Sequence, residues 1–256
     1  MDSPGTLAAD VIAALALPAE SRVDQRIPKK LFLENGAPTA ADRKRIQARI
    51  DEVTWVAVLK PATVAIPLHR SAEREYLEIA VLWMRTRDGD GDERLPELVH
   101  RAIPYPVLLL SEGGDTLSLS LAHKRWSLGD ASRVVLDGPL LVATLHLPLE
   151  DVERDFVASL GLSQQRPADL KELYDGWLAR AEALAAARVT RRYVVAASAP
   201  KVSERREALE RYGVVVKEIA ELRLAAERER QVNRRVELNL IIRRLEQERA
   251  EMLERI

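Results

Sequence analysis

Four histidines are the first candidates for metal binding or proton transfer: His69, His100, His123 and His146. No two of them lie within five residues of each other, so none of the spacings that bring two imidazoles onto one face of a helix or strand occurs. The chain also has no cysteine, which removes thiolate nucleophiles, disulfides and cysteine-containing metal sites. The sequence therefore predicts no metal site and no cofactor site.

A short cationic run of His123, Lys124 and Arg125 directly precedes Trp126. It lies at the predicted end of a strand, where a cation could contact a phosphate or a carboxylate of another molecule. The alternative interpretation is a solvated strand end beside a core tryptophan. We retain His123, Lys124 and Arg125 as candidate residues for binding nucleic acid or a protein partner.

Residues 88–93, with the sequence DGDGDE, resemble the start of a calcium-binding loop. The sixth position of such a loop is glycine and the twelfth is a bidentate glutamate, whereas this chain has Glu93 and Val99 at those positions. We interpret the segment as an acidic turn.

Paired carboxylates are the remaining option for hydrolytic chemistry, and Glu75 with Glu78 is one such pair near a strand start. A restriction-type nuclease core needs an acidic residue two positions before its lysine, but Ala122 stands two positions before Lys124. No Walker loop and no Gly-x-Ser-x-Gly elbow occurs either. The sequence thus predicts no catalytic residues, and a divergent metal-dependent nuclease is the third of three functional hypotheses.

Arginines gather near the C-terminus, and residues 228–244 have four more positive than negative charges. On one helix, Arg230 and Arg234 would lie one turn apart with Arg235 beside them. Such a stripe can bind phosphates, can bind an acidic protein surface, or can simply solvate a helix, and all three interpretations stay open. The arginines of this segment are Arg228, Arg230, Arg234, Arg235, Arg243 and Arg244.

Apolar residues at helical spacing predict the seam of a coiled-coil-like helix in the same region. No proline occurs in residues 201–256, and we expect nothing to break a helix from Val214 to Arg255. The polar segment 227–239 interrupts the seam, which indicates either a shift in register or a charged partner there. The seam residues are Leu238, Ile241, Leu245 and, after one missed position, Met252.

The rest of the chain alternates between strand and helix patterns. Residues 53–60 and 74–87 have strand character, and paired glycines predict a hairpin over residues 106–126. Residues 18–38 are interpreted as mostly irregular, and Thr39 as the N-cap of a helix. We predict an α+β fold with a mixed or antiparallel sheet, flanking helices on one side, a helical segment and a long C-terminal coiled-coil-like helix. The predicted regions are a body with an N-terminal helix at 1–148, a helical segment and connector at 149–200, and a long charged helix at 201–256.

Composition fits a chain with a sizeable core: 47% of the 256 residues are apolar. The net charge of −1 gives no overall attraction to nucleic acid or to an anionic membrane. No basic leader precedes the short apolar stretch near the N-terminus, and no apolar run approaches the ~20 residues that span a bilayer. Together with the absence of cysteine, these features lead us to expect a cytoplasmic protein without a membrane segment.

Five stretches, IPKKLF (27–32), REYLEI (74–79), RAIPYP (101–106), HKR (123–125) and QVNRRVELN (231–239), share their order and spacing with a bacterial family. On these stretches the chain resembles the domain-of-unknown-function 4391 family over nearly its whole length. The resemblance brings no assigned activity. It implies a genetic context, because such proteins tend to be encoded beside helicases and DNA methyltransferases, in clusters that look like restriction or anti-phage defence.

We therefore expect a non-catalytic interaction subunit of a bacterial DNA-modification or helicase-type anti-phage defence system, which docks partners through its C-terminal helix. The expected partner is a helicase or a DNA methyltransferase, or a second copy of the chain through the C-terminal helix. The alternatives are a nucleic-acid-binding protein that uses the C-terminal arginines, and the divergent nuclease. No cofactor is expected.

Overall fold

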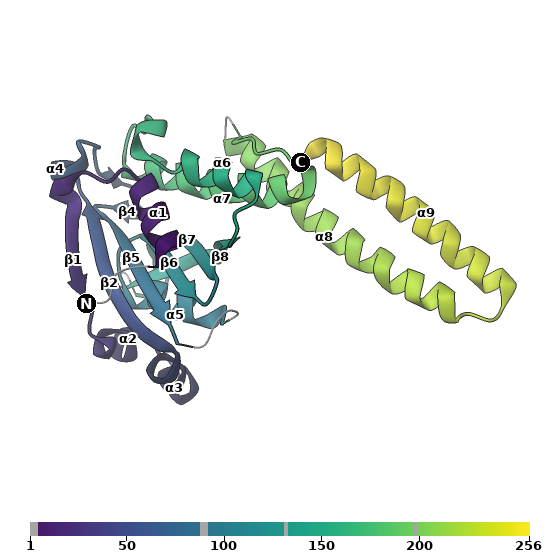
Figure 1. Cartoon of the computed structure of the whole chain (residues 1–256), viewed down its shortest axis with the longest axis horizontal. Helices are drawn as coiled ribbons and strands as arrows, with labels where there is room; N and C mark the ends of the chain where they lie inside the picture. The colour runs from purple at the N-terminus through teal and green to yellow at the C-terminus, as the bar shows by residue number, and fades with distance from the viewer. Residues whose placement is uncertain (1–4, 88–91, 131–132, 197–198) are drawn as a thin grey trace. The chain divides into compact units, whose positions relative to one another are not determined.

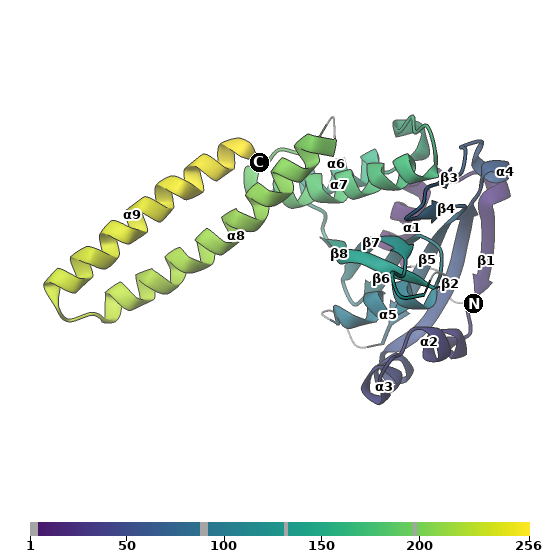
Figure 2. The same ribbon diagram turned by 180° about the vertical axis from the view of Figure 1, so that it is seen from behind.

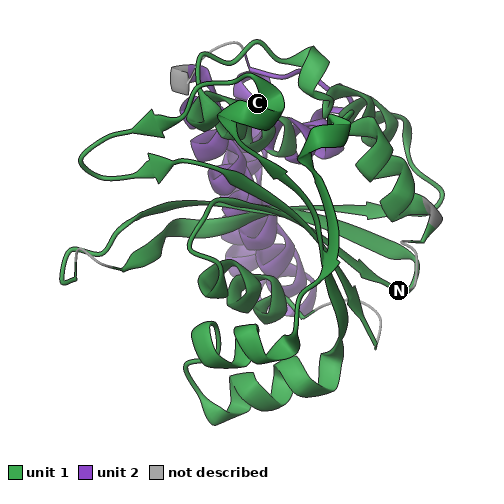
Figure 3. Cartoon of the chain, turned by 90° about the vertical axis from the view of Figure 1, so that its left-hand side faces the viewer, with its two compact units in different colours: residues 1–181 green, residues 182–256 purple. Residues whose placement is uncertain are grey.

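The computed structural model of the chain (Figure 1) describes residues 5–87, 92–130, 133–196 and 199–256. Most of the acidic turn interpreted from residues 88–93 lies outside the described residues. The chain divides into two compact units, Met1–Ala181 and Glu182–Ile256, which are coloured separately in Figure 3.

A six-stranded mixed sheet forms the centre of the first unit, with the strand order β1-β2-β5-β6-β7-β8. Strands β5 and β6 pair in parallel, and every other neighbouring pair is antiparallel. The strands are β1 (Arg22–Arg26), β2 (Ile50–Leu59), β5 (Ile79–Thr86), β6 (Val107–Gly113), β7 (Thr116–Trp126) and β8 (Val134–His146). Two short strands, β3 (His69–Arg70) and β4 (Glu75–Tyr76), form a separate antiparallel pair, visible in Figure 2. The predicted α+β class with a mixed sheet is confirmed.

Helices cover both faces of this sheet (Figures 1 and 3). Phe32, Ile46 and Leu98 pack on one face in a core cluster with sheet residues such as Leu82. The helices on that face are α2 (Lys29–Asn35), α3 (Ala40–Arg49) and α5 (Arg94–Ala102), and those of the other face are α1 (Thr6–Ala14), α6 (Asp151–Ser159) and α7 (Leu170–Thr190). The helices expected on one side of the body, α2, α3 and α5, lie on one face, and the predicted helical segment after residue 148 supplies α6 and α7 to the other (Figure 1). All six residues of 79–84 are buried, and an interior strand without a polar face needs such cover on both sides.

Local predictions for the first unit are mostly confirmed. The Thr39 hydroxyl accepts a hydrogen bond from the Asp42 backbone N–H at 3.1 Å, as an N-cap does. Strands β6 and β7 form the predicted hairpin, with Gly114 at a φ of 59°. Residues 18–38 are not mostly irregular, since they contain β1, α2 and a short 3-10 helix, Ala19–Ser21. The edge strand β1 gave no signal because its five residues include a single apolar side chain. The remaining short helices are α4 (Pro61–Val64) and the 3-10 helix Leu162–Gln164.

The second unit contains a helical hairpin of α8 (Ala199–Arg228) and α9 (Val232–Arg255), which lie side by side in Figures 1 and 2. The helices bury a shared cluster made by Val215, Ile219 and Ala226 of α8 with Ile242 and Leu245 of α9. Ion pairs join Arg211 to Glu248 and Arg223 to Glu246. The helical C-terminus is confirmed, but it is not unbroken from Val214 to Arg255.

The break has a physical reason in the sequence. The polar segment 227–239 contains the turn, and residues 227–231 have no apolar side chain that could continue the seam. By folding back at residues 229–231, the chain buries two half-length apolar stripes against each other. None of the helices in the described ranges has an apolar stretch that could cross a membrane.

Candidate functional site

The cationic run predicted as a binding site is split by the strand that carries it. Side chains alternate across a strand, so His123 and Arg125 of β7 lie on the α7 face while Lys124 lies on the α5 face. The three residues therefore do not form one surface.

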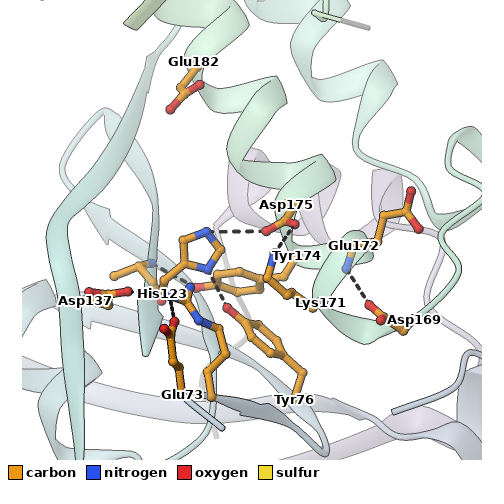
Figure 4. A network of polar contacts seen from close by, with 12 residues as sticks. Glu73, Tyr76, His123, Asp137, Asp169, Lys171, Glu172, Tyr174, Asp175 and Glu182 are labelled. Carbon is orange, nitrogen blue, oxygen red and sulfur yellow. Dashed lines mark hydrogen bonds and ion pairs between the residues drawn. The ribbon is translucent and has the colours of Figure 1, made fainter. Parts of the chain in front are cut away.

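Tyr76, His123 and Asp175 form a chain of polar contacts that links β4, β7 and α7 (Figure 4). The Tyr76 hydroxyl contacts Nδ1 of His123, and Nε2 of His123 lies 3.4 Å from a carboxylate oxygen of Asp175. Lys171, one helical turn before Asp175, lies 2.6 Å from the other oxygen of that carboxylate. Because a carboxylate only accepts, this arrangement assigns the ring proton to Nε2, and Nδ1 accepts from the tyrosine.

Burial sets the protonation of this chain of contacts. Burial lowers the pKa of His123, and the negative charge of Asp175 opposes that shift. Burial also raises the pKa of Tyr76 well above its usual range. The result near neutral pH is a neutral imidazole held between a phenol and a carboxylate. Both ring nitrogens of His123 have protein partners, so this ring has no free nitrogen to act on a substrate.

Arg125 takes part in a second group of ion pairs beside the first. Asp137 of β8 lies 3.3 Å from Nε of Arg125 and 2.8 Å from a guanidinium nitrogen of Arg74. His69 of β3 contacts Asp169 at 2.8 Å, and its ring centroid lies 6.2 Å from that of Tyr76. Arg74 and Arg125 thus share the anionic neighbour Asp137, so neither of these two arginines is an unpaired cation.

Lys124 is 3% exposed and lies inside the body of the first unit. Its ammonium group donates to the backbone carbonyl of His100 at 2.8 Å and to the carbonyls of Ile103 and Tyr105. These carbonyls belong to the end of α5 and the residues after it, where a helix leaves its last acceptors unpaired. Burial lowers the pKa of Lys124 to about 7. Lys124 thus stabilises the end of α5 and is not accessible to a phosphate outside.

Of the six arginines predicted as a stripe, four gather at the end of the hairpin. Arg228 ends α8, Arg230 lies in the turn, and Arg234 and Arg235 lie near the start of α9. These four exposed residues are called the tip arginines below. Arg243 and Arg244 follow nine residues later, a rotation of about 900°, so each faces the side of α9 opposite to Arg234 or Arg235. The arginines therefore surround the hairpin and do not form one stripe.

The tip arginines differ from the arginines nearer the open end of the hairpin in how they are paired. Arg206, Arg211 and Arg223 form ion pairs with Glu182, Glu248 and Glu246. Of the six C-terminal arginines, Arg234 is the one with an ion-pair partner among the described residues, Glu229 at 3.9 Å. Arg228, Arg230 and Arg235 of the tip therefore have no ion pair with a described residue, and the same holds for Arg243 and Arg244.

The predicted partner-helix seam is largely covered within the chain itself. Leu238 and Leu245 pack against α8 in the hairpin cluster, and Met252 is half-buried. Ile241 is 45% exposed. The apolar residues that α9 leaves most exposed are on a different line, formed by Val232, Val236 and Leu240, which are 63%, 51% and 61% exposed.

The carboxylates considered for metal chemistry have other partners. Glu78 forms an ion pair with Lys60 at 3.1 Å. Within residues 5–87, 92–130, 133–196 and 199–256, no three His, Asp or Glu side chains gather in a way that could hold a metal ion.

Sequence reasoning missed Tyr76, Asp137 and Asp175, the partners of His123 and Arg125, and also Lys171, the partner of Asp175. Tyr76 lies 47 residues from His123, and no local spacing connects them. The stretches REYLEI and HKR, noted for the family resemblance, contain Tyr76 and His123, but they give no sign that the two touch.

Comparison with known proteins gives a family and no function. No curated protein matches the chain, and no solved structure does. A family model described as "Domain of unknown function (DUF4391)" matches residues 15–248. That span includes the contacts around His123 and the tip arginines. The chain therefore belongs to the DUF4391 family.

Proposed function

We propose that this protein is a non-catalytic interaction subunit that docks a protein partner through the α8–α9 hairpin. The observation that carries the proposal is the line of Val232, Val236 and Leu240 along α9, called the outer stripe below. These residues are spaced by four and so follow one another on successive helical turns.

The outer stripe lies on the side of α9 that α8 does not cover. Leu240 follows the inward-facing Leu238 by two residues, a rotation of about 200° around the helix. In residues 201–256, 26 of 56 side chains are charged, so polar residues were readily available for a face that meets only water. Three consecutive apolar positions on such a face favour burial against another molecule, in the manner of an amphipathic helix in a groove.

The proposed partner is a helicase or a DNA methyltransferase of a bacterial anti-phage defence system. This part of the proposal rests on the genetic neighbourhood that the family resemblance implies. The satisfied polar contacts around His123 support a non-catalytic role, since they engage both ring nitrogens of the most suitable acid-base residue in the body.

The test uses two matched triple variants of the full chain. In the first, Val232, Val236 and Leu240 are changed to Gln; in the second, Val214, Val216 and Leu253 are changed to Gln. Both sets consist of two valines and one leucine that are exposed; the first set lies on α9, and the second has its valines on α8 and its leucine on α9. Each chain is co-expressed with the products of the adjacent genes, and the affinity for any partner recovered is then measured with purified proteins.

Burial of a valine or leucine contributes about 1.5–3 kcal/mol, so loss of the outer stripe should weaken binding by at least about tenfold. The second variant should bind like the unmodified chain, and both should keep their helix content by circular dichroism. Equal affinity of the two variants for the partner would rule out docking through the outer stripe.

A further inference from the structure

The tip arginines point to a second binding site, independent of the outer stripe. We propose that the tip of the α8–α9 hairpin binds the phosphate backbone of nucleic acid. The site consists of Arg228, Arg230, Arg234 and Arg235, together with the exposed amide side chains of Gln231 and Asn233 between them.

Charge at the tip is strongly one-sided. Residues 228–235 contain four arginines and one acidic residue, Glu229, which lies 3.9 Å from Arg234. Arg228, Arg230 and Arg235 form no ion pair with any described residue. The end of α8 and the start of α9 meet here, so their opposite helix dipoles cancel and the side chains supply the positive field.

The type of cation fits a phosphate ligand. From residue 218 to the end of the chain there are nine arginines and no lysine. A guanidinium group forms two parallel hydrogen bonds with a phosphate, which a lysine ammonium cannot do. Glutamine and asparagine donate to phosphates as well, and Gln231 lies at the N-cap of α9 while Asn233 lies in its first turn.

The arrangement favours a polymer of phosphates over a single flat acidic surface. Arg234 and Arg235 are about 100° apart around α9, and Arg228 comes from the other helix. A flat protein surface would meet these side chains from one direction only. A flexible chain with a charge at every residue can follow them around the tip, which is how sequence-independent binding works.

The test is fluorescence anisotropy with a labelled 20-nucleotide single strand and a labelled 20-base-pair duplex, using the full chain. Four phosphate contacts on duplex DNA predict a slope of about −3.6 for log K against log salt, which is a loss of about 150-fold between 50 and 200 mM salt. The triple variant R228E/R230E/R235E should lose most of the affinity at 50 mM salt. Its slope should become shallower, at about −0.9 or closer to zero, because at most one of the four contacts remains.

The matched control is K201E/K217E/R255E, which makes the same change in net charge at exposed positions of the same helices away from the tip. It should keep the slope of the unmodified chain. The neutral variant R228Q/R230Q/R235Q should have an affinity between those of the charge-reversed variant and the control. It replaces the charge-reversed variant in the test if that variant loses its helix content.

Three results would overturn the proposal: no binding of either nucleic acid at 50 mM salt, a tip variant that binds as well as the unmodified chain, or a control that loses as much affinity as the tip variant. Binding of polyglutamate without binding of nucleic acid would also overturn it, and would assign the tip to an acidic protein.

Discussion

Replacing Lys124 with methionine should remove a pH dependence of stability that the chain owes to one buried ammonium group. Burial lowers the pKa of Lys124 from 10.5 to about 7 in the folded state. Between these values the unfolded chain keeps the proton and the folded chain releases it. The free energy of unfolding therefore rises with pH across this window, and the cost of the buried charge is greatest below pH 7.

The size of the effect follows from the two pKa values. Each pH unit between them contributes about 1.4 kcal/mol, and half of the folded molecules have already lost the proton at pH 7. Between pH 7 and pH 9 the unmodified chain should gain about 2 kcal/mol relative to Lys124→Met. The three carbonyl contacts act in the opposite direction, because they favour the charged form. The measured slope shows which of the two effects dominates.

The assay is urea unfolding at pH 7, 8 and 9, followed by tryptophan fluorescence. All four tryptophans lie in the first unit, so the signal reports on the body that contains Lys124. Arg125→Met is the control, since it removes one positive charge from the neighbouring position on the opposite face of β7 and should keep the slope. Parallel pH profiles for the unmodified chain and Lys124→Met would refute the reasoning and show that the carbonyls keep Lys124 protonated.

Two further predictions concern packing. Ile242→Ala should destabilise the hairpin by about 2 kcal/mol, seen as faster hydrogen exchange in α8 and α9, because Ile242 lies in their shared cluster. The adjacent Ile241 is exposed, so Ile241→Ala should change the stability of the hairpin, measured by the same exchange, by less than about 0.5 kcal/mol. A larger effect would contradict the observed orientation of α9. Tyr174→Phe should lower the stability of the body by about 1–3 kcal/mol in urea unfolding, because the hydroxyl accepts from the Ala122 N–H at 2.9 Å and donates to the Val107 carbonyl at 2.7 Å. An unchanged urea midpoint would mean that this hydroxyl does not hold α7 to the sheet.

Much of the fold could be predicted because its signals are local. The paired glycines before β7 and the Thr39 cap each depend on a few neighbouring residues, and both predictions are confirmed. Strand β1 and helix α2 were missed because short elements at an edge have weak patterns. The interruption of the seam was visible in the sequence and was interpreted as a register shift or a charged partner. That it is a turn became clear only from the packing of α9 against α8.

For the candidate sites too, local features could be read from the sequence and long-range contacts could not. The sequence by itself determined that arginines and apolar residues at helical spacing gather near the C-terminus, because composition and helical period are properties of a short segment. It also contained the strand alternation that separates Lys124 from His123 and Arg125. Only the tertiary structure decided that α5 covers Lys124, and that Tyr76 and Asp175 meet His123 from 47 and 52 residues away. Contacts over such separations depend on how whole helices and strands pack, and local sequence patterns do not predict this packing.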